Sequence, residues 1–274
     1  MSRLGRYGLS APASLVLLLL LVMAAAPSLF TSADPLRTSL PERLTPPGAA
    51  FLFGTDEFGR DLYSRVVHGT RYSLVAGLGT VGLAMLLGGM VGMVAGLGGR
   101  RVDALLMRVV DVFLAFPYLA LAIVIGAILG RSLENAVLAL AIAWWPQYAR
   151  LMRGQVIAVR GAEFVAAARS VGASARRVAL RHVLPNCFSP LLVKASLDVG
   201  YAILAVAGLS FLGLGVAPPT PEWGALIGSG RNYMLRAWWY LIFPGLAIFV
   251  TVMACNLIGD GLRDWFDPYM ERGS

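Results

Sequence analysis

Residues 72–97 read YSLVAGLGTVGLAMLLGGMVGMVAGL, an apolar run without a single charged side chain. Because a helix needs about 20 consecutive apolar residues to cross the hydrocarbon core of a bilayer, this run is long enough to span a membrane. Five further runs meet the same criterion and cover residues 10–30, 106–129, 133–152, 187–215 and 238–259. The sequence therefore predicts an all-α, polytopic membrane protein with six transmembrane helices.

The composition and the charge distribution agree with a membrane protein. Of the 274 residues, 58% are hydrophobic and 14% are charged, whereas soluble domains carry about 25% charged residues. With the N-terminus placed inside, the predicted cytoplasmic segments hold fourteen arginines and the outer segments hold eight. This positive-inside bias puts both termini in the cytoplasm. The formal charge of +8 thus reports topology, and we expect no nucleic-acid partner.

The first apolar run imitates a secretory signal peptide, because Arg3 and Arg6 precede it and small residues follow it. The uncharged stretch extends from Tyr7 to Ala33, however, which is longer than a typical signal core. We therefore expect it to be retained as a helix. The predicted organisation is a cytoplasmic N-terminus (1–9), a first transmembrane helix (10–30), an extracytoplasmic segment (31–71), a five-helix core (72–259) and a cytoplasmic tail (260–274).

Residues 54–74, around the end of the extracytoplasmic segment, read GTDEFGRDLYSRVVHGTRYSL. Phe58, Leu62 and Val66 recur at i, i+4 and i+8, which predicts a short helix along the membrane interface before the second span. A polar lead-in with no specific contact is the alternative. On the helical interpretation, the polar residues face elsewhere; they are Arg60, Asp61, Ser64 and Arg65.

Glycine and proline residues indicate where helices approach closely or bend. Gly88, Gly92 and Gly96 are spaced by four, so they share one face and allow close contact with another helix. Pro117 and Pro146 interrupt the third and fourth spans, where each removes a backbone hydrogen bond and favours a kink. Bent helices suit a pathway that opens and closes, although inert kinks are at least as common.

Few polar or reactive side chains lie in the spans. Cys187 and Cys255 are isolated, so we interpret them as small buried hydrophobes and expect neither a metal site nor a disulfide. Lys194 and Asp198 lie one helical turn apart in the fifth span and therefore share a face. Either they pair because both are buried, or Lys194 snorkels to the cytoplasmic boundary and Asp198 lines a wet pathway.

A long cytoplasmic insertion separates the fourth and fifth spans, and residues 160–186 of it read RGAEFVAAARSVGASARRVALRHVLPN. Phe164, Ala168 and Val171 recur at i, i+4 and i+7 and predict an amphipathic helix that stops at Gly172. An amphipathic helix that projects from a membrane domain needs a groove for its apolar face. A partner protein is the natural supplier of that groove.

A second short helix is expected directly after this glycine. Ser174 can cap it, Val178 and Val183 lie on one side of it, and Pro185 is expected to end it. Gly172 then occupies the corner between two short helices, a position that often requires a positive φ, which glycine adopts at little cost.

The same segment resembles the cytoplasmic signature of permeases of ATP-binding-cassette importers, which reads Glu-Ala-Ala, three residues, Gly, nine residues, Ile, one residue, Leu-Pro. Ala167 and Ala168 stand three residues before Gly172, and Leu184-Pro185 follow at the expected distance. Two positions depart from the general form, because Ala166 occupies the glutamate position and His182 the isoleucine position.

The dipeptide/oligopeptide/nickel branch of that family is similar to this chain at the two departures. It has a glutamate three residues earlier, here Glu163, and the run Arg-His-x-Leu-Pro-Asn, here Arg181 to Asn186. The branch also resembles three other motifs, GTDEFGRDLYSR (54–65), GLSFLGLGVAPPTPEWG (208–224) and GDGLRDWFDP (259–268). The resemblance thus covers nearly the whole chain after residue 50.

This resemblance implies a type I importer permease fold in the bacterial cytoplasmic membrane, with cytoplasmic coupling helices between the fourth and fifth spans. The implied partners are a second permease, two cytoplasmic ATPases that bind ATP and Mg, and an extracytoplasmic solute-binding protein. The implied ATPase-coupling residues are Glu163, Phe164, Ala167, Ala168, Gly172, Arg181, His182, Leu184 and Pro185. Candidates for an extracytoplasmic gate or a binding-protein contact are Asp56, Arg60, Asp61, Pro221 and Trp223.

The expected role is that of a non-catalytic subunit in di- or oligopeptide uptake. The chain has no GxxxxGK[ST] loop for nucleotide phosphates, and His68 and His182 lie on opposite sides of the predicted membrane, so we expect no cofactor and no catalytic residue. Nickel, glutathione or another small solute is the alternative substrate. A more remote alternative is a secondary transporter driven by an ion gradient, which would use ionisable residues within spans; the candidates are Asp111, Lys194 and Asp198.

Overall fold

The computed structural model describes residues 10–266, and this part of the chain is mostly helical. The predicted N-terminus (1–9) and the end of the predicted tail (267–274) lie outside the described residues. Within them, the only β-type pairing is an isolated bridge between Thr55 and Asp61. The main helices are α2 (Ser10–Ala25), α3 (Leu62–Leu97), α4 (Arg100–Leu114), α5 (Tyr118–Leu129), α6 (Leu133–Arg160), α7 (Glu163–Ser170), α8 (Ala175–Arg177), α9 (Leu184–Phe211), α10 (Trp223–Gly230) and α11 (Trp239–Phe266).

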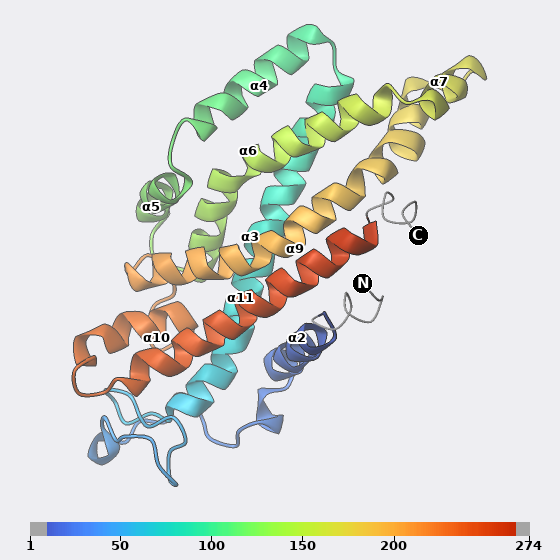
Figure 1. The fold of residues 1–274 in the computed structure, drawn as a ribbon. Coiled ribbons are helices and arrows are strands. Elements are labelled where there is room, and N and C mark those ends of the chain that lie inside the picture. Colours follow the sequence, from blue (N-terminus) through green and yellow to red (C-terminus); the bar gives the residue numbers. More distant parts are fainter. Residues whose placement is uncertain (1–9, 267–274) are drawn as a thin grey trace.

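Four helices form the body of the molecule. Figure 1 shows α3, α6, α9 and α11 running along one elongated bundle, in which α3 packs on α6, and α9 packs on α3, α6 and α11. Helix α7 projects at one end of the bundle, whereas α10 and the 26–61 segment lie at the other end (Figure 1). The two ends therefore offer different surfaces to their surroundings.

Fewer helices pass a length-and-composition test for spans than the six predicted. In the described chain, three helices are long and apolar enough, Leu62–Leu97, Ala175–Phe211 and Trp239–Asp264. Helices α4 and α5 would add a fourth span as a pair bent by 86°. The apolar part of α2, Pro12–Ala25, is short, and polar residues such as Gln147 and Arg150 interrupt the apolar sequence of α6.

The glycines predicted to permit close helix packing lie against α6. A Cβ atom added to Gly88 would stand 2.2 Å from the carbonyl oxygen of Trp145, and one added to Gly92 would stand 2.3 Å from that of Ala149. At Gly96 the nearest atom would be a methyl carbon of Val156, at 2.6 Å. Because lipid tails are as apolar as side chains, such close packing is a main source of helix association in membranes.

The two prolines predicted to kink helices behave differently. Pro117 lies at the junction of α4 and α5, where the axis turns by 86°, so the predicted interruption is confirmed and is a full break. Pro146 lies inside α6, which continues from Leu133 to Arg160.

Cys187 and Cys255 are buried free thiols, as expected of small apolar side chains.

The predicted interfacial helix before the second span is not a separate element. Helix α3 begins at Leu62 and continues without a break to Leu97, and Phe58 lies before its start. Asp61 caps α3, because its carboxylate accepts the backbone N–H groups of Tyr63 and Ser64 at 3.3 and 3.2 Å. The cap fixes the helix start, and α3 then projects straight into the bundle.

We expect the α3–α6 contact to tolerate no added methyl group at Gly92. Gly92→Ala would push a Cβ atom against the backbone of α6, and overpacking of this kind costs about 1–3 kcal/mol. The free energy of unfolding of the purified chain in detergent should fall by that amount. Gly82→Ala is the matched control on the same helix, since its Cβ would meet nothing within 4 Å. Equal stability of the two variants would contradict the close contact.

Candidate functional site

The corner of the 160–186 segment has the geometry that its sequence predicts. Helix α7 begins with Glu163 in its first turn, where a carboxylate stabilises the helix dipole. Gly172 follows the helix with φ of +86°. Its N–H donates to the carbonyl of Arg169 at 2.9 Å, and the N–H of Ala173 donates to that of Ala168 at 3.1 Å. These bonds satisfy the last carbonyls of α7 and fix the chain reversal.

The second helix of the segment does not end at Pro185, contrary to the prediction. The Ser174 side chain accepts the N–H of Arg177 at 3.4 Å, but the helical run that begins there continues as Ala175–Phe211. Residues Val178–Val183 form a π-helical turn, in which the N–H of Leu184 bonds to the carbonyl of Ala179. This wider turn accommodates Pro185, which has no N–H to donate.

Helix α7, the Gly172 corner and the start of the following helix form a hairpin, which we call the α7 hairpin. One side of this hairpin is packed and the other is open. Val165, Val178 and Val183 are at most 2% exposed, and they share a cluster with Met152 and Cys187. This packing ties the hairpin to the ends of α6 and α9.

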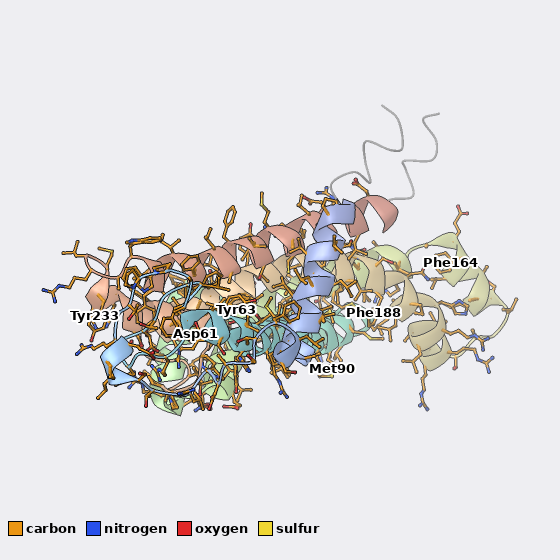
Figure 2. All side chains as sticks on the ribbon, turned by 90° about the horizontal axis from the view of Figure 1, so that it is seen from below. Asp61, Tyr63, Met90, Phe164, Phe188 and Tyr233 are labelled. Atoms are coloured by element: carbon orange, nitrogen blue, oxygen red, sulfur yellow. The ribbon has the colours of Figure 1, made fainter. Side chains whose placement is uncertain are left out.

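The predicted apolar side of α7 lies on the open face instead. Phe164 is 47% exposed and Val171 is 86% exposed. Figure 2 shows Phe164 at the far end of the molecule, away from Tyr63 and Tyr233. The other predicted coupling residues lie on the same hairpin with exposed or half-buried side chains; they are Glu163, Ala167, Ala168, Arg181, His182, Leu184 and Pro185. An apolar side chain on this surface is available to a partner.

At the opposite end, four of the five predicted gate residues are buried and Asp61 is half-buried. Asp56 is 0% exposed and Arg60 is 4% exposed. The Asp56 carboxylate accepts the N–H of Arg60 at 3.0 Å and its guanidinium Nε at 2.5 Å. Arg65, which the sequence pattern placed on a polar side, is also buried, with Nε 3.4 Å from the same carboxylate. A buried charge needs such partners, because an unpaired one is costly.

The buried ionic cluster of Asp56, Arg60 and Arg65 joins three segments of the chain. The Arg65 guanidinium donates to the carbonyl of Pro35 at 3.0 Å and to that of Pro219 at 3.1 Å. The cluster therefore holds the 26–61 segment and the loop before α10 onto the start of α3. Burial raises the pKa of the neighbouring Asp61 carboxyl, although hydrogen bonds from two backbone N–H groups act in the opposite direction.

The remaining predicted gate residues anchor α10. Trp223 is 0% exposed and its indole N–H donates to the carbonyl of Val66 at 2.9 Å. The carbonyl oxygen of Pro221 would lie 2.2 Å from a Cβ atom at Gly69, so this loop touches α3 directly. Glu222, which the sequence interpretation missed, caps α10 by accepting the N–H groups of Gly224 and Ala225, both at 2.8 Å. A contact of these residues with another protein stays a prediction.

A further polar cluster lies between α6 and α9. Lys194 Nζ is 2.9 Å from Asp198 Oδ2, so the two residues pair as in the first alternative, although neither side chain is fully buried. The sequence interpretation missed the third member, Tyr148, whose hydroxyl donates to the Asp198 carboxylate at 2.6 Å. Lys194 Nζ also lies 3.4 Å from Gln147 Oε1. Helix periodicity relates residues within one helix, whereas Tyr148 and Gln147 come from a second one.

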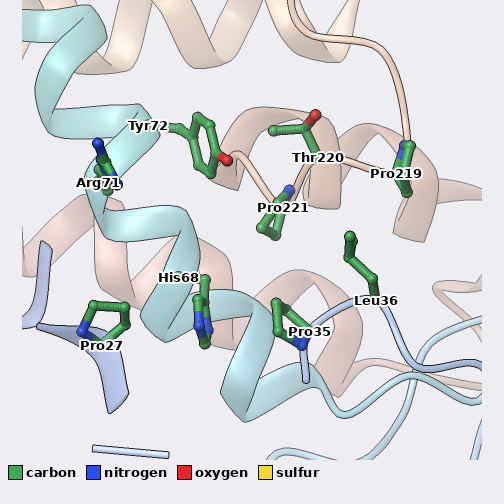
Figure 3. A pocket seen from close by; sticks show the side chains of 9 residues that line it. All are labelled: Pro27, Pro35, Leu36, His68, Arg71, Tyr72, Pro219, Thr220 and Pro221. Carbon is green, nitrogen blue, oxygen red and sulfur yellow. The ribbon is translucent and has the colours of Figure 1, made fainter. Parts of the chain in front are cut away.

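A small cavity opens beside the start of α3. Figure 3 shows His68, Arg71 and Tyr72 of α3 facing Pro35 and Pro219 across it. Its volume is about 170 Å³, whereas pockets for drug-sized ligands measure about 300–1,000 Å³. This cavity is smaller than such pockets.

Comparison with known proteins assigns the chain to a family. The family model described as "Binding-protein-dependent transport system inner membrane component" matches residues 88–272. The chain is 48% identical to the probable D,D-dipeptide transport system permease protein of Escherichia coli (strain K12), covering 93% of this chain and 86% of that protein. It is 48% identical to the di/tripeptide transport system permease protein of Pseudomonas aeruginosa (strain UCBPP-PA14), with 84% and 78% covered.

A nickel permease is also among the similar proteins. The nickel transport system permease protein of Escherichia coli (strain K12) is 43% identical, covering 94% of this chain and 93% of that protein. The family match spans α6, the exposed hairpin, α9 and most of the remaining described bundle. This chain belongs to the family of inner membrane components of binding-protein-dependent transport systems.

Proposed function

We propose that this chain is a permease subunit of a bacterial ATP-binding-cassette importer for di- and oligopeptides. The observation that carries the proposal is the exposed α7 hairpin, which presents Phe164 and Val171 at one end of a membrane bundle. Two relatives are named as permeases for D,D-dipeptides and for di/tripeptides, which supports the substrate class. Nickel is a second candidate, because a nickel permease is 43% identical.

In the proposed topology, six spans are formed by α2, α3, the bent α4–α5 pair, α6, α9 and α11. Helix α6 can cross despite its polar residues because they find partners on neighbouring helices. Arg153 pairs with Asp103 of α4 through two hydrogen bonds, the longer of 2.6 Å, and Arg150 lies 2.6 Å from Asp111. The arginine distribution supports a cytoplasmic location for both termini and the α7 hairpin.

The proposed assembly contains a second permease, two cytoplasmic ATPases and an extracytoplasmic solute-binding protein, all around a lipid bilayer. The α7 hairpin would bury its apolar side in a groove of one ATPase, and the ATPases would hold ATP and Mg. The opposite end, with the 26–61 segment and α10, would face the binding protein. This chain would then contribute pathway and coupling but no cofactor and no catalytic group.

Thiol labelling checks the proposed orientation. In a background lacking Cys187 and Cys255, a membrane-impermeant maleimide should label Leu235→Cys in intact cells, because this residue is 96% exposed at the proposed outer end. Val171→Cys, which is 86% exposed at the hairpin, should be labelled only after the membrane is permeabilised. Labelling of Val171→Cys in intact cells would refute the orientation.

The glycine corner should be essential for coupling. A Cβ atom at Gly172 would meet nothing within 4 Å, so any effect of Gly172→Val comes from its φ of +86°, which a β-branched residue strongly disfavours. We expect normal membrane abundance but at least a tenfold loss of ATP-dependent peptide uptake. Gly172→Asn is the matched control, because asparagine tolerates positive φ better, and it should retain most uptake. Equal uptake by both variants would contradict the role of the corner.

A charge on the open face of α7 should prevent ATPase binding. Phe164→Asp would expose the proposed groove to a carboxylate and should abolish co-purification of the ATPases, because an unpaired charge buried in an interface is costly. Phe164→Leu keeps an apolar side chain and should co-purify normally. Because Phe164 is 47% exposed, neither change should lower membrane abundance. Normal co-purification of Phe164→Asp would remove this face from the proposed contact.

A further inference from the structure

The Lys194–Asp198 pair lies in the middle of the bundle and is not fully covered by this chain. Asp198 is near the middle of α9 (Leu184–Phe211), and its partner Tyr148 is near the middle of α6 (Leu133–Arg160). The Lys194 and Asp198 side chains are nevertheless 28% and 15% exposed. In the proposed topology, this opening lies within the membrane, in the cytoplasmic halves of the apolar runs 133–152 and 187–215.

Lipid is a poor neighbour for that opening. Charged side chains in hydrocarbon are costly, and those found within spans usually face a bundle interior or a water-filled cavity. Tyr201 is three residues beyond Asp198, on the same face of α9, and is 56% exposed. The exposed face therefore continues beyond the pair with a phenol side chain, whose hydroxyl can bond to water in a wet pathway.

The hydrogen bonds that the pair makes within this chain leave room for a ligand to bond to the Lys194 ammonium and to the Asp198 carboxylate. Tyr148 anchors the Asp198 carboxylate from α6 at 2.6 Å, and Gln147 lies 3.4 Å from the Lys194 ammonium. An ammonium has three donors and a carboxylate has about four acceptor sites, which is more than these contacts use. A ligand that carries both charges can thus bond to each partner without leaving either one unpaired.

We propose that Lys194 and Asp198 form a binding station for zwitterionic solutes on the translocation pathway. The Lys194 ammonium binds the solute's carboxylate, and the Asp198 carboxylate binds its ammonium group. The station rests on the proposed importer function and specifies its substrate class. A bare divalent cation does not fit it, because the positive charge of Lys194 lies 2.9 Å from the only carboxylate of the cluster. The station therefore favours peptides with free termini over nickel ions.

Uptake by an apolar replacement of the pair tests the station. The importer, assembled with its sister permease and ATPases in vesicles, would be supplied with binding protein loaded with radiolabelled dialanine. Lys194→Met with Asp198→Leu leaves no charge unpaired, so a merely structural pair should tolerate the change. We expect binding-protein-stimulated ATP hydrolysis to persist while dialanine uptake falls at least tenfold. Arg153→Met with Asp103→Leu, a pair with similar side-chain exposures of 33% and 24%, should stay within about twofold of wild-type uptake.

Thiol reactivity tests the same surface by a readout other than uptake. In the background lacking Cys187 and Cys255, Tyr201→Cys should react with a charged, water-soluble thiol reagent, and dialanine should slow that reaction. Leu18→Cys, 58% exposed on the apolar helix α2, should not react, because a thiolate does not form in lipid.

Three outcomes would overturn the station. They are normal uptake by the apolar double variant, an unreactive Tyr201→Cys, and failure of the double variant to assemble with its sister permease, which would assign the pair to a subunit contact. Failure of the importer function itself is distinguishable, because the wild-type assembly would then show no ATP-dependent dialanine uptake.

Discussion

The close contact between α3 and α6 is the constraint on which the other elements depend. Water drives apolar helices together in soluble proteins, but within a bilayer two helices associate only if their surfaces fit better than lipid fits either one. Gly88 and Gly92 provide that fit, because side chains there would collide with the backbone of α6. Helix α9 then packs on both members of the pair. Helix α5 packs on α6, and α11 packs on α9.

Features set by local stereochemistry could be predicted from the sequence. The glycine face of α3, the break at Pro117 and the positive φ of Gly172 each follow from the residue itself and its neighbours along the chain. Features set by distant segments could not. Arg65 is buried because carbonyl groups 30 and 154 residues away accept its hydrogen bonds, and no periodicity in α3 indicates those partners.

The same distinction applies to the composition test of the helices and to Pro185, which was predicted to end a helix. A composition test scores Arg150 and Arg153 of α6 as charges, although each has a carboxylate partner on α4. A proline normally interrupts helical bonding, but the π-helical turn Val178–Val183 absorbs the missing donor. In both cases, the residue type alone does not predict the partner or the turn that allows the residue to stay in a helix.

The helical run from Ala175 to Phe211 has a mechanical consequence. Its 37 residues span roughly 55 Å at 1.5 Å per residue, so the run connects the Gly172 corner with the opposite end of the bundle. A tilt imposed on the hairpin would first reach the π-helical turn Val178–Val183, where a helix can bend, and only then the rest of α9. Asp198, about two thirds of the way along, would then shift relative to Tyr148 on α6, with which it shares a hydrogen bond.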